Sequence, residues 1–442
     1  MFSEHKNSYL QLVCAANPRV INKAVDRAMR YKRKDMRDEI PPAKRLSSMQ
    51  PSLFAPMTDV TRAQLGFGRV GLRVLNKELS SNDNLIQLQA IHSILDQVQI
   101  SENAIFLINL NIIYRLTEIM HDRDPIIREK ICLILTHLAH YYQGRQGMLS
   151  RPIIVEKLMY LIMRDRKEIR YAAAYTLRTL ARYKCTSEVI LKTENIIENL
   201  LKMVKDEHTG IIFIHLKTLC ELCEWDPETA LRANGFQVML ILFSNHDKRV
   251  SAKAMECMTQ LCKHEVGKQL ADIHDLNLLL LKHYLSSSYV GVILSAVGLM
   301  TYTTVTTRSK WRAKEFTYEL TKRLMALTKA HNSALMQIRV MQVLINLCDC
   351  PDIRYHMKKY WERKVQAIKI RTHEEWNGTS EITSYGFESG HNYRTMCIEG
   401  VETIKNDYGD NVNVVNVHSY LERVHHVKKH LLRAINFKPH VN

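Results

Sequence analysis

Glycine and proline are scarce in this chain, with 15 and 10 among its 442 residues. Both residues interrupt helices, so their scarcity beside abundant Leu, Ile, Met, Ala, Lys and Arg favours long helices with short connections. Strand signals are also thin, because no series of alternating β-branched or aromatic residues is bounded by Asn-Gly or Asp-Gly turns. The composition therefore predicts an all-α fold.

A long hydrophobic run is missing as well. Residues 286–307 carry no charge, but nine of these 22 residues are Ser or Thr. The apolar part, Val290 to Met300, is shorter than the ~20 residues that a membrane span requires. The first residues lack the basic and then apolar pattern of a secretory signal. We therefore expect a buried helix at 286–307, a cytoplasmic chain and no membrane partner.

No Cys or His pattern has the spacing of a metal site. Cys220-x-x-Cys223 lacks a second pair at zinc-finger spacing, and His137 and His140 lack the His-Glu-x-x-His order. Most of the ten cysteines lie in apolar helical stretches, which is typical of reduced, buried thiols in intracellular proteins. The P-loop and nucleophile-elbow sequences are also absent. We therefore expect no enzymatic activity, metal, cofactor or small-molecule substrate.

Acidic residues are outnumbered, since 45 Asp and Glu accompany 62 Lys and Arg and the net charge is +17. Such an excess implies an acidic partner surface, which could be nucleic acid, anionic lipid or an acidic protein such as tubulin. Two stretches concentrate the charge. Residues 19–45 contain ten Lys or Arg, including Lys32-Arg33-Lys34 and Lys44-Arg45, and residues 354–371 contain seven against one acid, Glu362. Charge alone does not choose among these partners.

What the sequence does have is a repeat with a period near forty residues. Leu138-Ala139 recurs as Leu180-Ala181 and then as Leu222-Cys223, in two steps of 42 residues. Equivalent positions occur at Ile94-Leu95, Leu261-Cys262 and Leu347-Cys348, with a weaker unit around Thr301. Each unit reads as a Leu-rich helix, a polar turn and a second long helix that ends at the repeated position.

No unit of this kind can bury its apolar face alone, so neighbouring units must stack into a continuous core. The sequence therefore predicts an armadillo/HEAT-type α-solenoid, a right-handed superhelix of about seven helical repeats. Asp and Asn in the polar turns are expected to cap the helices that follow. In Ile127-Arg128 and Ile169-Arg170 we expect the apolar member to pack under the turn.

The domain organisation follows from the extent of the repeat. We expect a basic N-terminal extension at 1–57, partly helical or disordered, and an armadillo-like solenoid at 58–350. A basic helix with an inserted loop segment is expected at 351–411, because residues 373–411 are rich in Gly, Ser, Asn and Asp. A C-terminal helix and tail are expected at 412–442, with the helix running from about Asn413 to Ile435.

The second helix of each unit should line the concave face, where peptides usually lie on such solenoids. Nuclear-import adaptors of the armadillo class present a Trp-x-x-x-Asn ladder there. The matching positions here are Leu133/His137, Tyr175/Thr179, Lys217/Glu221, Glu256/Gln260 and Gln342/Asn346, so that ladder is absent. The candidate partner-binding residues are instead a mixed set, namely His137, Tyr175, Arg178, Arg182, Glu221, Glu224 and Lys263. An ordinary solvated helix face remains the alternative interpretation.

A more specific pattern begins near residue 59. It reads Asp59-x-Thr61-x-Ala63, Phe67-Gly68, Leu72, Leu75-Asn76-x-Glu78-Leu79-x-Ser81-x-Asp83 and Gln89-Ala90. Further stretches of the same kind are Asp226-Pro227-Glu228-Thr229-Ala230-Leu231, Glu265-x-Gly267-Lys268 and Ile435-Asn436-Phe437-Lys438-Pro439. In these stretches the chain resembles the armadillo-repeat radial spoke head protein family of cilia (radial spoke head fourteen homolog, also called the rhabdoid tumour deletion region protein).

The resemblance covers residues 58–350 and the last helix, and it rests on many weak matches. It implies a non-catalytic scaffold of the axonemal radial spoke in motile cilia or flagella, located in the cytoplasm and cytoskeleton, with other spoke subunits as partners. Residues 1–57 and 361–411 depart from the family. The alternative is a nuclear or nucleic-acid-associated armadillo-repeat adaptor, because Lys32-Arg33-Lys34 and Lys44-Arg45 are spaced like a two-part nuclear localisation signal. We favour protein partners over nucleic acid.

Overall fold

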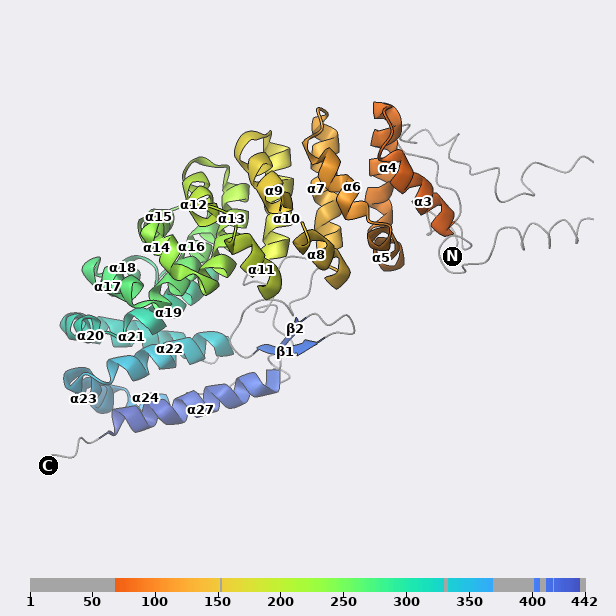
Figure 1. Cartoon of the computed structure of the whole chain (residues 1–442). Helices are drawn as coiled ribbons and strands as arrows, with labels where there is room; N and C mark the ends of the chain where they lie inside the picture. The colour runs from red at the N-terminus through yellow and green to blue at the C-terminus, as the bar shows by residue number, and fades with distance from the viewer. Residues whose placement is uncertain are drawn as a thin grey trace, which may run out of the picture. The chain divides into compact units, whose positions relative to one another are not determined.

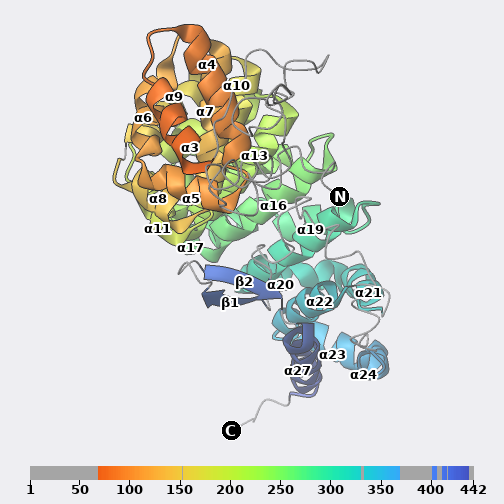
Figure 2. The same ribbon diagram turned by 90° about the vertical axis from the view of Figure 1, so that its right-hand side faces the viewer.

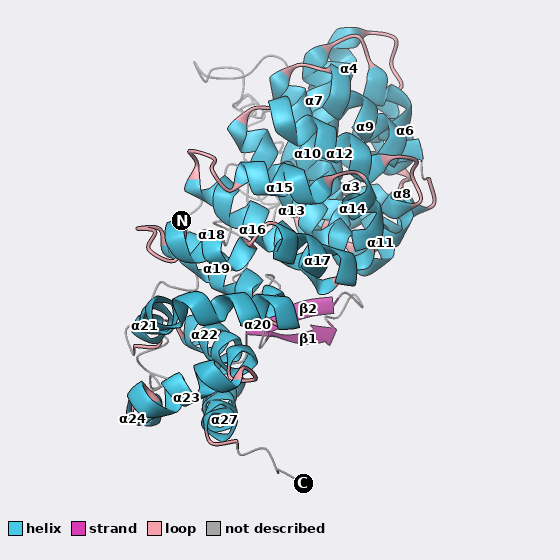
Figure 3. Cartoon of the chain, turned by 90° about the vertical axis from the view of Figure 1, so that its left-hand side faces the viewer, coloured by secondary structure: helices cyan, strands magenta, loops and turns pink. Residues whose placement is uncertain are grey.

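The structure, a computed structural model, describes residues 68–151, 153–329, 333–368, 401–405, 411–415 and 417–437. In these ranges the chain is helical apart from one two-stranded ribbon (Figure 3). The chain divides into two compact units, Met1–Thr179 and Leu180–Asn442, and each is described by itself. The predicted all-α fold class is confirmed. The basic clusters within residues 1–57, the segment 369–400 and the closing Lys438-Pro439 lie outside the described residues.

The first unit consists of helices that succeed one another along the chain (Figure 1). They are α3 (Gly68–Glu78), α4 (Asn84–Gln97), α5 (Ser101–Asn109), α6 (Ile112–Glu118) with the 3-10 turn η4 (Ile119–His121), α7 (Pro125–Ala139), α8 (Tyr142–Leu149), α9 (Ile153–Arg164) and α10 (Lys167–Ala181), whose last two residues belong to the second unit. The long helices α4 and α7 pack against each other. Each ends at the repeated Leu position that the sequence identified.

From α5 onward, each described repeat contains three helices and not the two that the sequence predicted. A short helix follows each repeated Leu position, as α5 and α8 do in the first unit. Gly144 in α8 explains how closely this helix approaches, because a Cβ there would collide with the backbone carbonyl of Leu138. Arg145 donates from Nη1 to the carbonyls of Ala139 and His140, both at 3.0 Å, and so satisfies the end of α7. Three helices per repeat are the armadillo arrangement.

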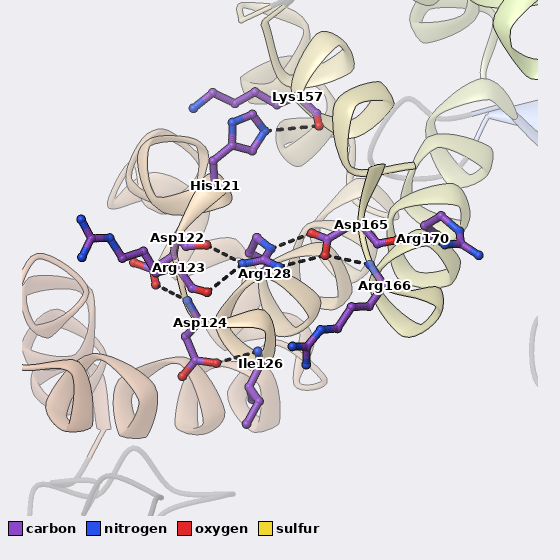
Figure 4. A network of polar contacts seen from close by, with 10 residues as sticks. All are labelled: His121, Asp122, Arg123, Asp124, Ile126, Arg128, Lys157, Asp165, Arg166 and Arg170. Atoms are coloured by element: carbon purple, nitrogen blue, oxygen red, sulfur yellow. Dashed lines mark hydrogen bonds and ion pairs between the residues drawn. The ribbon is translucent and has the colours of Figure 1, made fainter. Parts of the chain in front are cut away.

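The polar turns cap the helices that follow them, as predicted. Asp83 accepts a hydrogen bond from the Leu85 N–H at 2.9 Å, and Asp124 accepts one from the Ile126 N–H at 2.8 Å (Figure 4). The apolar members of the two Ile-Arg pairs, Ile127 and Ile169, are fully buried under their turns. Local sequence therefore determines the start of α4 and α7 and the face that α7 and α10 bury.

Arg128, the charged member of the first pair, links two successive turns (Figure 4). Its Nε and Nη2 donate to the Asp165 carboxylate at 2.6 and 2.8 Å, and its Nη1 donates to the carbonyls of Asp122 and Arg123. Burial raises the pKa of Asp165, but hydrogen bonds from Arg128 and the Arg166 N–H outweigh this and hold the pKa below its ordinary value. The carboxylate therefore stays ionised in a fork-shaped, two-bond contact with the guanidinium.

We predict that Arg128→Ala destabilises the first unit by about 2–4 kcal/mol, because it leaves the partly buried Asp165 carboxylate without its partner. Urea unfolding followed by circular dichroism measures the change. Arg123→Ala is the matched control, since its side chain is exposed and points away from the network (Figure 4). Equal stability of the two variants would show that the contact does not join the repeats.

The second unit continues the three-helix pattern from Leu180 onward. Its helices are α11 (Lys184–Leu191), α12 (Ile196–Asp206), α13 (Thr209–Trp225), α14 (Pro227–Arg232), α15 (Gly235–Leu242), α16 (Lys248–Lys263), α17 (Glu265–Ile273), α18 (Leu276–His283), α19 (Val290–Thr303), α20 (Thr307–Ala313), the 3-10 turn η5 (Lys314–Phe316), α21 (Thr317–Leu327), α22 (Ala334–Leu347), α23 (Pro351–Tyr360), α24 (Glu362–Gln366) and α27 (Val417–Ile435). The long helix that ends each repeat is its third helix. The third helices α13, α16, α19 and α22 pack on one another in that order.

The uncharged stretch 286–307 forms α19, and Val292 to Met300 are largely buried between neighbouring third helices. Among the described helices none has the length and apolar character that crossing a membrane requires. The uncharged run is therefore explained by burial between repeats.

The last helix, α27, occupies the place of a third helix. It packs on α22 and also contacts α23 and α24 (Figure 2). Its inner face is apolar, and Val424, Leu431 and Ile435 are buried. Lys428 Nζ donates to the carbonyls of Gln366 and Ile368 at 2.8 and 2.9 Å, which satisfies the end of α24. The final repeat is therefore α23, α24 and α27, although α24 and α27 are far apart in sequence.

The segment between α24 and α27 differs from the expected loop. Strands β1 (Val401–Lys405) and β2 (Asn411–Val415) pair antiparallel, with Val401 opposite Val415. Because β2 takes up residues 411–415, α27 begins at Val417 and not near Asn413. The sequence signal was weak, since Gly, Ser and Asn surround these short strands.

We predict that Leu431→Asp releases α27 from α22, because it buries an unpaired carboxylate against an apolar face, where several kcal/mol are at stake. Limited proteolysis should then cleave α27 from the chain. Lys429→Asp, on the exposed side of the same helix, is the control and should stay resistant. Resistance of both variants would mean that α27 does not need this contact.

Candidate protein-interaction surface

The third helices of the first unit present an aromatic and cationic strip on α10. Tyr171, Tyr175 and Arg178 are spaced by four and three residues, so they lie on one face. The two tyrosine rings are nearly parallel with centroids 6.5 Å apart, and the Arg178 guanidinium carbon lies 5.5 Å from the Tyr175 centroid. Tyr171 is 49% exposed. Two of the predicted candidates, Tyr175 and Arg178, thus belong to one strip, and Tyr171 was missed.

His137, the other candidate of the first unit, is half-buried on α7. It occupies the position one repeat before Thr179, whose hydroxyl donates to the Tyr175 carbonyl at 2.9 Å within α10. Both positions correspond to the asparagine of the import ladder. The Thr179 hydroxyl donates its only hydrogen within its own helix. It therefore cannot also donate to a partner in place of that asparagine.

In the second unit, two of the four candidates come together. Lys263 Nζ, at the end of α16, lies 3.9 Å from Glu224 Oε1 on α13 and 6.0 Å from the Tyr302 ring centroid on α19. Both charged side chains are more than a third exposed, so the ion pair adds little stability. These three residues end three successive third helices. Glu221 and Arg182 are half-buried, and Tyr302 was not predicted.

A partly buried charged cluster lies elsewhere on the same helices and was also missed. Lys253 Nζ is 2.6 Å from Glu256 Oε2 on α16, and the Ser295 hydroxyl on α19 is 3.3 Å from the other carboxylate oxygen. Arg339 on α22 donates to the Leu294 carbonyl at 3.0 Å. Burial raises the pKa of Glu256, but Lys253, Arg339 and Ser295 together bring it below its ordinary value. The cluster connects three successive third helices.

Gly298 on α19 leaves space for the Arg339 side chain. A Cβ at this position would lie 2.7 Å from Arg339 Nη1. Among the ladder positions compared above, only Asn346 carries the asparagine of the import ladder. Its Nδ2 donates to the Thr301 carbonyl at 2.9 Å and to Thr304 Oγ1 at 3.2 Å. This amide therefore holds α22 to α19 and is committed within the chain.

We predict that Glu256→Gln destabilises the second unit by about 1–3 kcal/mol, because it leaves Lys253 and Arg339 without their counter-charge. The pKa of Glu256 is depressed on folding, so its contribution is present above the unfolded value near ~4.3 and is lost as pH falls through the folded value. Thermal unfolding between pH 7 and 3 should therefore be less acid-dependent in the variant. Glu224→Gln, in the exposed pair, is the control and should retain the wild-type profile.

The cysteines noted in the sequence lie in the helical core. Cys220 and Cys223 on α13 and Cys257 on α16 are all buried, and the Cys257 thiol donates to the Leu216 carbonyl at 3.0 Å. Burial raises the pKa of the Cys223 and Cys257 thiols well above the ordinary value, so they stay protonated. Over the described ranges, no group of three or more His, Cys, Asp or Glu is placed to hold a metal ion.

Comparison with known proteins places the chain by its fold. No family model matches it. It is similar to the vacuole morphology and inheritance protein 14 of Saccharomyces cerevisiae, with 27% identity over 213 residues that make up 47% of this chain and 24% of the yeast protein. The chain thus spans about a quarter of that relative's length.

Solved structures show the same kind of solenoid. An engineered protein superposes with a TM-score of 0.52 and 14% identity, covering 69% of this chain and 86% of its own. A designed armadillo repeat protein in complex with the peptide (KR)4 gives a TM-score of 0.48 and 13% identity, covering 52% of this chain and 99% of its own. With its three-helix repeats, the chain is an armadillo-repeat-like α-solenoid.

Proposed function

We propose that this chain is a non-catalytic scaffold that binds other proteins on the exposed faces of its third helices. The observation that supports this most directly is the Tyr171–Tyr175–Arg178 strip on α10. Tyrosine and arginine are enriched where interfaces gain most of their affinity, because they offer large contact areas and several hydrogen bonds. The strip fills no core position, since Tyr171 is 49% exposed and Tyr175 and Arg178 are only half-buried.

We further propose that the scaffold is a structural part of the axonemal radial spoke in motile cilia or flagella. The support is the sequence resemblance described above, which includes Leu72, Leu75 and Leu79. These three leucines are buried in the first unit, so this part of the resemblance concerns residues that pack the helical core. The Asp226-Pro227-Glu228-Thr229 stretch forms the cap and first turn of α14, where the Asp226 carboxylate accepts from the Thr229 N–H at 3.1 Å. Other spoke subunits are then the expected partners.

The test compares two matched pairs in full-length protein expressed in ciliated cells. We expect Tyr175→Ala with Arg178→Glu to reduce co-purification of spoke subunits by at least about tenfold, which corresponds to 1.4 kcal/mol. Tyr160→Ala with Arg164→Glu on α9 is the control, because this guanidinium carbon also lies near a tyrosine centroid, at 5.2 Å, on a second helix. Circular dichroism confirms that both variants are folded.

Several outcomes would contradict the proposal. Equal recovery of spoke subunits with both variant pairs would show that the α10 strip is not part of the interface. Absence of the protein from axonemes would exclude the radial spoke while leaving the solenoid as a scaffold. Accumulation in nuclei that depends on Lys44 and Arg45, together with DNA binding that falls steeply with salt, would favour the nuclear adaptor instead. Those two residues lie outside the described ranges.

A further inference from the structure

Large aromatic side chains gather on the outer helices near the C-terminal end of the second unit. Tyr318 on α21 is 63% exposed, and Tyr355 and Tyr360 on α23 are 68% and 55% exposed. His356 joins them, with ring centroids 6.1 Å from Tyr318 and 4.8 Å from Tyr360. Burial lowers the pKa of His356, so near neutral pH it serves as an uncharged ring between the two tyrosines.

Lysines alternate with these rings. Lys322 Nζ lies 5.8 Å from the Tyr318 centroid, and Lys359 Nζ lies 5.2 Å from the Tyr360 centroid. We call Tyr318, Lys322, Tyr355, His356, Lys359 and Tyr360 the aromatic–lysine surface. Exposed apolar patches that serve no core are a mark of interaction sites, and here Tyr318 and Tyr360 are each accompanied by a positive charge.

The positive charge of this surface exceeds the negative charge of its acidic neighbours, one of which, Glu362, accepts a hydrogen bond from Asn436 Nδ2 at 2.7 Å. Asp352 pairs with Lys314 at 2.6 Å, Asp349 with Lys310 at 2.7 Å, and Glu319 with Arg323 at 3.0 Å. Asp352, Asp349 and Glu319 therefore each already have a cation.

Lys322 and Lys359 form no ion pair with the described part of the chain. The adjoining Lys358, Arg363 and Lys364 form none there either. Five cations are thus available to an external anion.

The position of the lysines distinguishes two kinds of anionic ligand. Single-stranded nucleic acids bind through bases that stack on open aromatic faces. Here the ammonium groups of Lys322 and Lys359 lie 5.8 and 5.2 Å from the ring centroids of Tyr318 and Tyr360, within the range of cation–π attraction, so a stacking base would compete with them for those rings. Carboxylates can instead bind the ammonium groups and the tyrosine hydroxyls, while the methylene carbons of glutamate pack on ring edges.

We infer that the aromatic–lysine surface binds an acidic peptide segment of another protein, rich in glutamate. The surface lies on α21 and α23, which are second and first helices of their repeats, so it is separate from the third-helix faces of the proposed scaffold function. Either site can therefore bind without the other. Complementary charge accelerates encounter, and the tyrosines supply contact area at low entropic cost.

The test uses fluorescence polarisation of full-length protein with a fluorescein-labelled (Glu-Gly)5 peptide and a matched (Gln-Gly)5 peptide. We expect Lys322→Gln with Lys359→Gln, and separately Tyr318→Ala with Tyr360→Ala, to weaken binding of the acidic peptide by at least about tenfold. Lys202→Gln with Lys205→Gln on α12 is the control and should change binding less than about twofold, because these exposed lysines have no aromatic partner. Thermal melting confirms that all variants are folded.

Three results would overturn the inference. Unchanged affinity in both surface variants would mean that the peptide binds elsewhere, for example to the basic residues 19–45. Loss in the lysine variant without loss in the tyrosine variant would indicate general charge attraction, since the tyrosine variant keeps the net charge. Tighter binding of a ten-residue oligo-dT that is lost in the tyrosine variant would make the surface a nucleic-acid site.

Discussion

The packing of one third helix on the next is the interaction on which the rest of this structure depends. Leu138, Leu222, Leu261 and Leu347 have no exposed surface, and each closes the end of a third helix. A single repeat has no other element against which to bury these side chains, so its stability comes from its neighbours. The same constraint explains α27, which covers the free face of α22 and turns His425, Lys429 and Arg433 toward solvent.

Features that depend on local chemistry were predictable from the sequence. Buried leucines at a 42-residue step, Asp caps at helix starts and the Ile residues under the turns all follow from side-chain type and spacing. The short first helices were not predictable, because they span only six to ten residues and are held by contacts to the preceding repeat. Gly267 in α17 is an example. A Cβ at this position would collide with the Leu261 carbonyl at the end of α16, and the sequence alone does not show that contact.

The candidate surface shows the same division. Tyr175 with Arg178 could be proposed from helical spacing, because both lie on α10. Glu224 and Lys263 were proposed singly, but their contact through adjacent third helices required the stacking geometry. Arg339 lies outside the compared ladder positions and reaches the Leu294 carbonyl, 45 residues earlier, only where Gly298 leaves space. Sequence spacing within one helix cannot report such contacts between helices.

The distribution of ion pairs explains why the chain has free charge to offer. Two partly buried carboxylates are matched by cations, as Asp165 is by Arg128 and Glu256 by Lys253, because an unpaired buried charge is costly. The outer helices near the C-terminus pair Asp349 and Asp352 in the same way, yet they carry more lysines than acids. The surplus cannot be neutralised within the described chain, and it lies beside exposed tyrosines. Part of the net charge of +17 is therefore carried where the described fold leaves cations unpaired, and those places suit acidic partners.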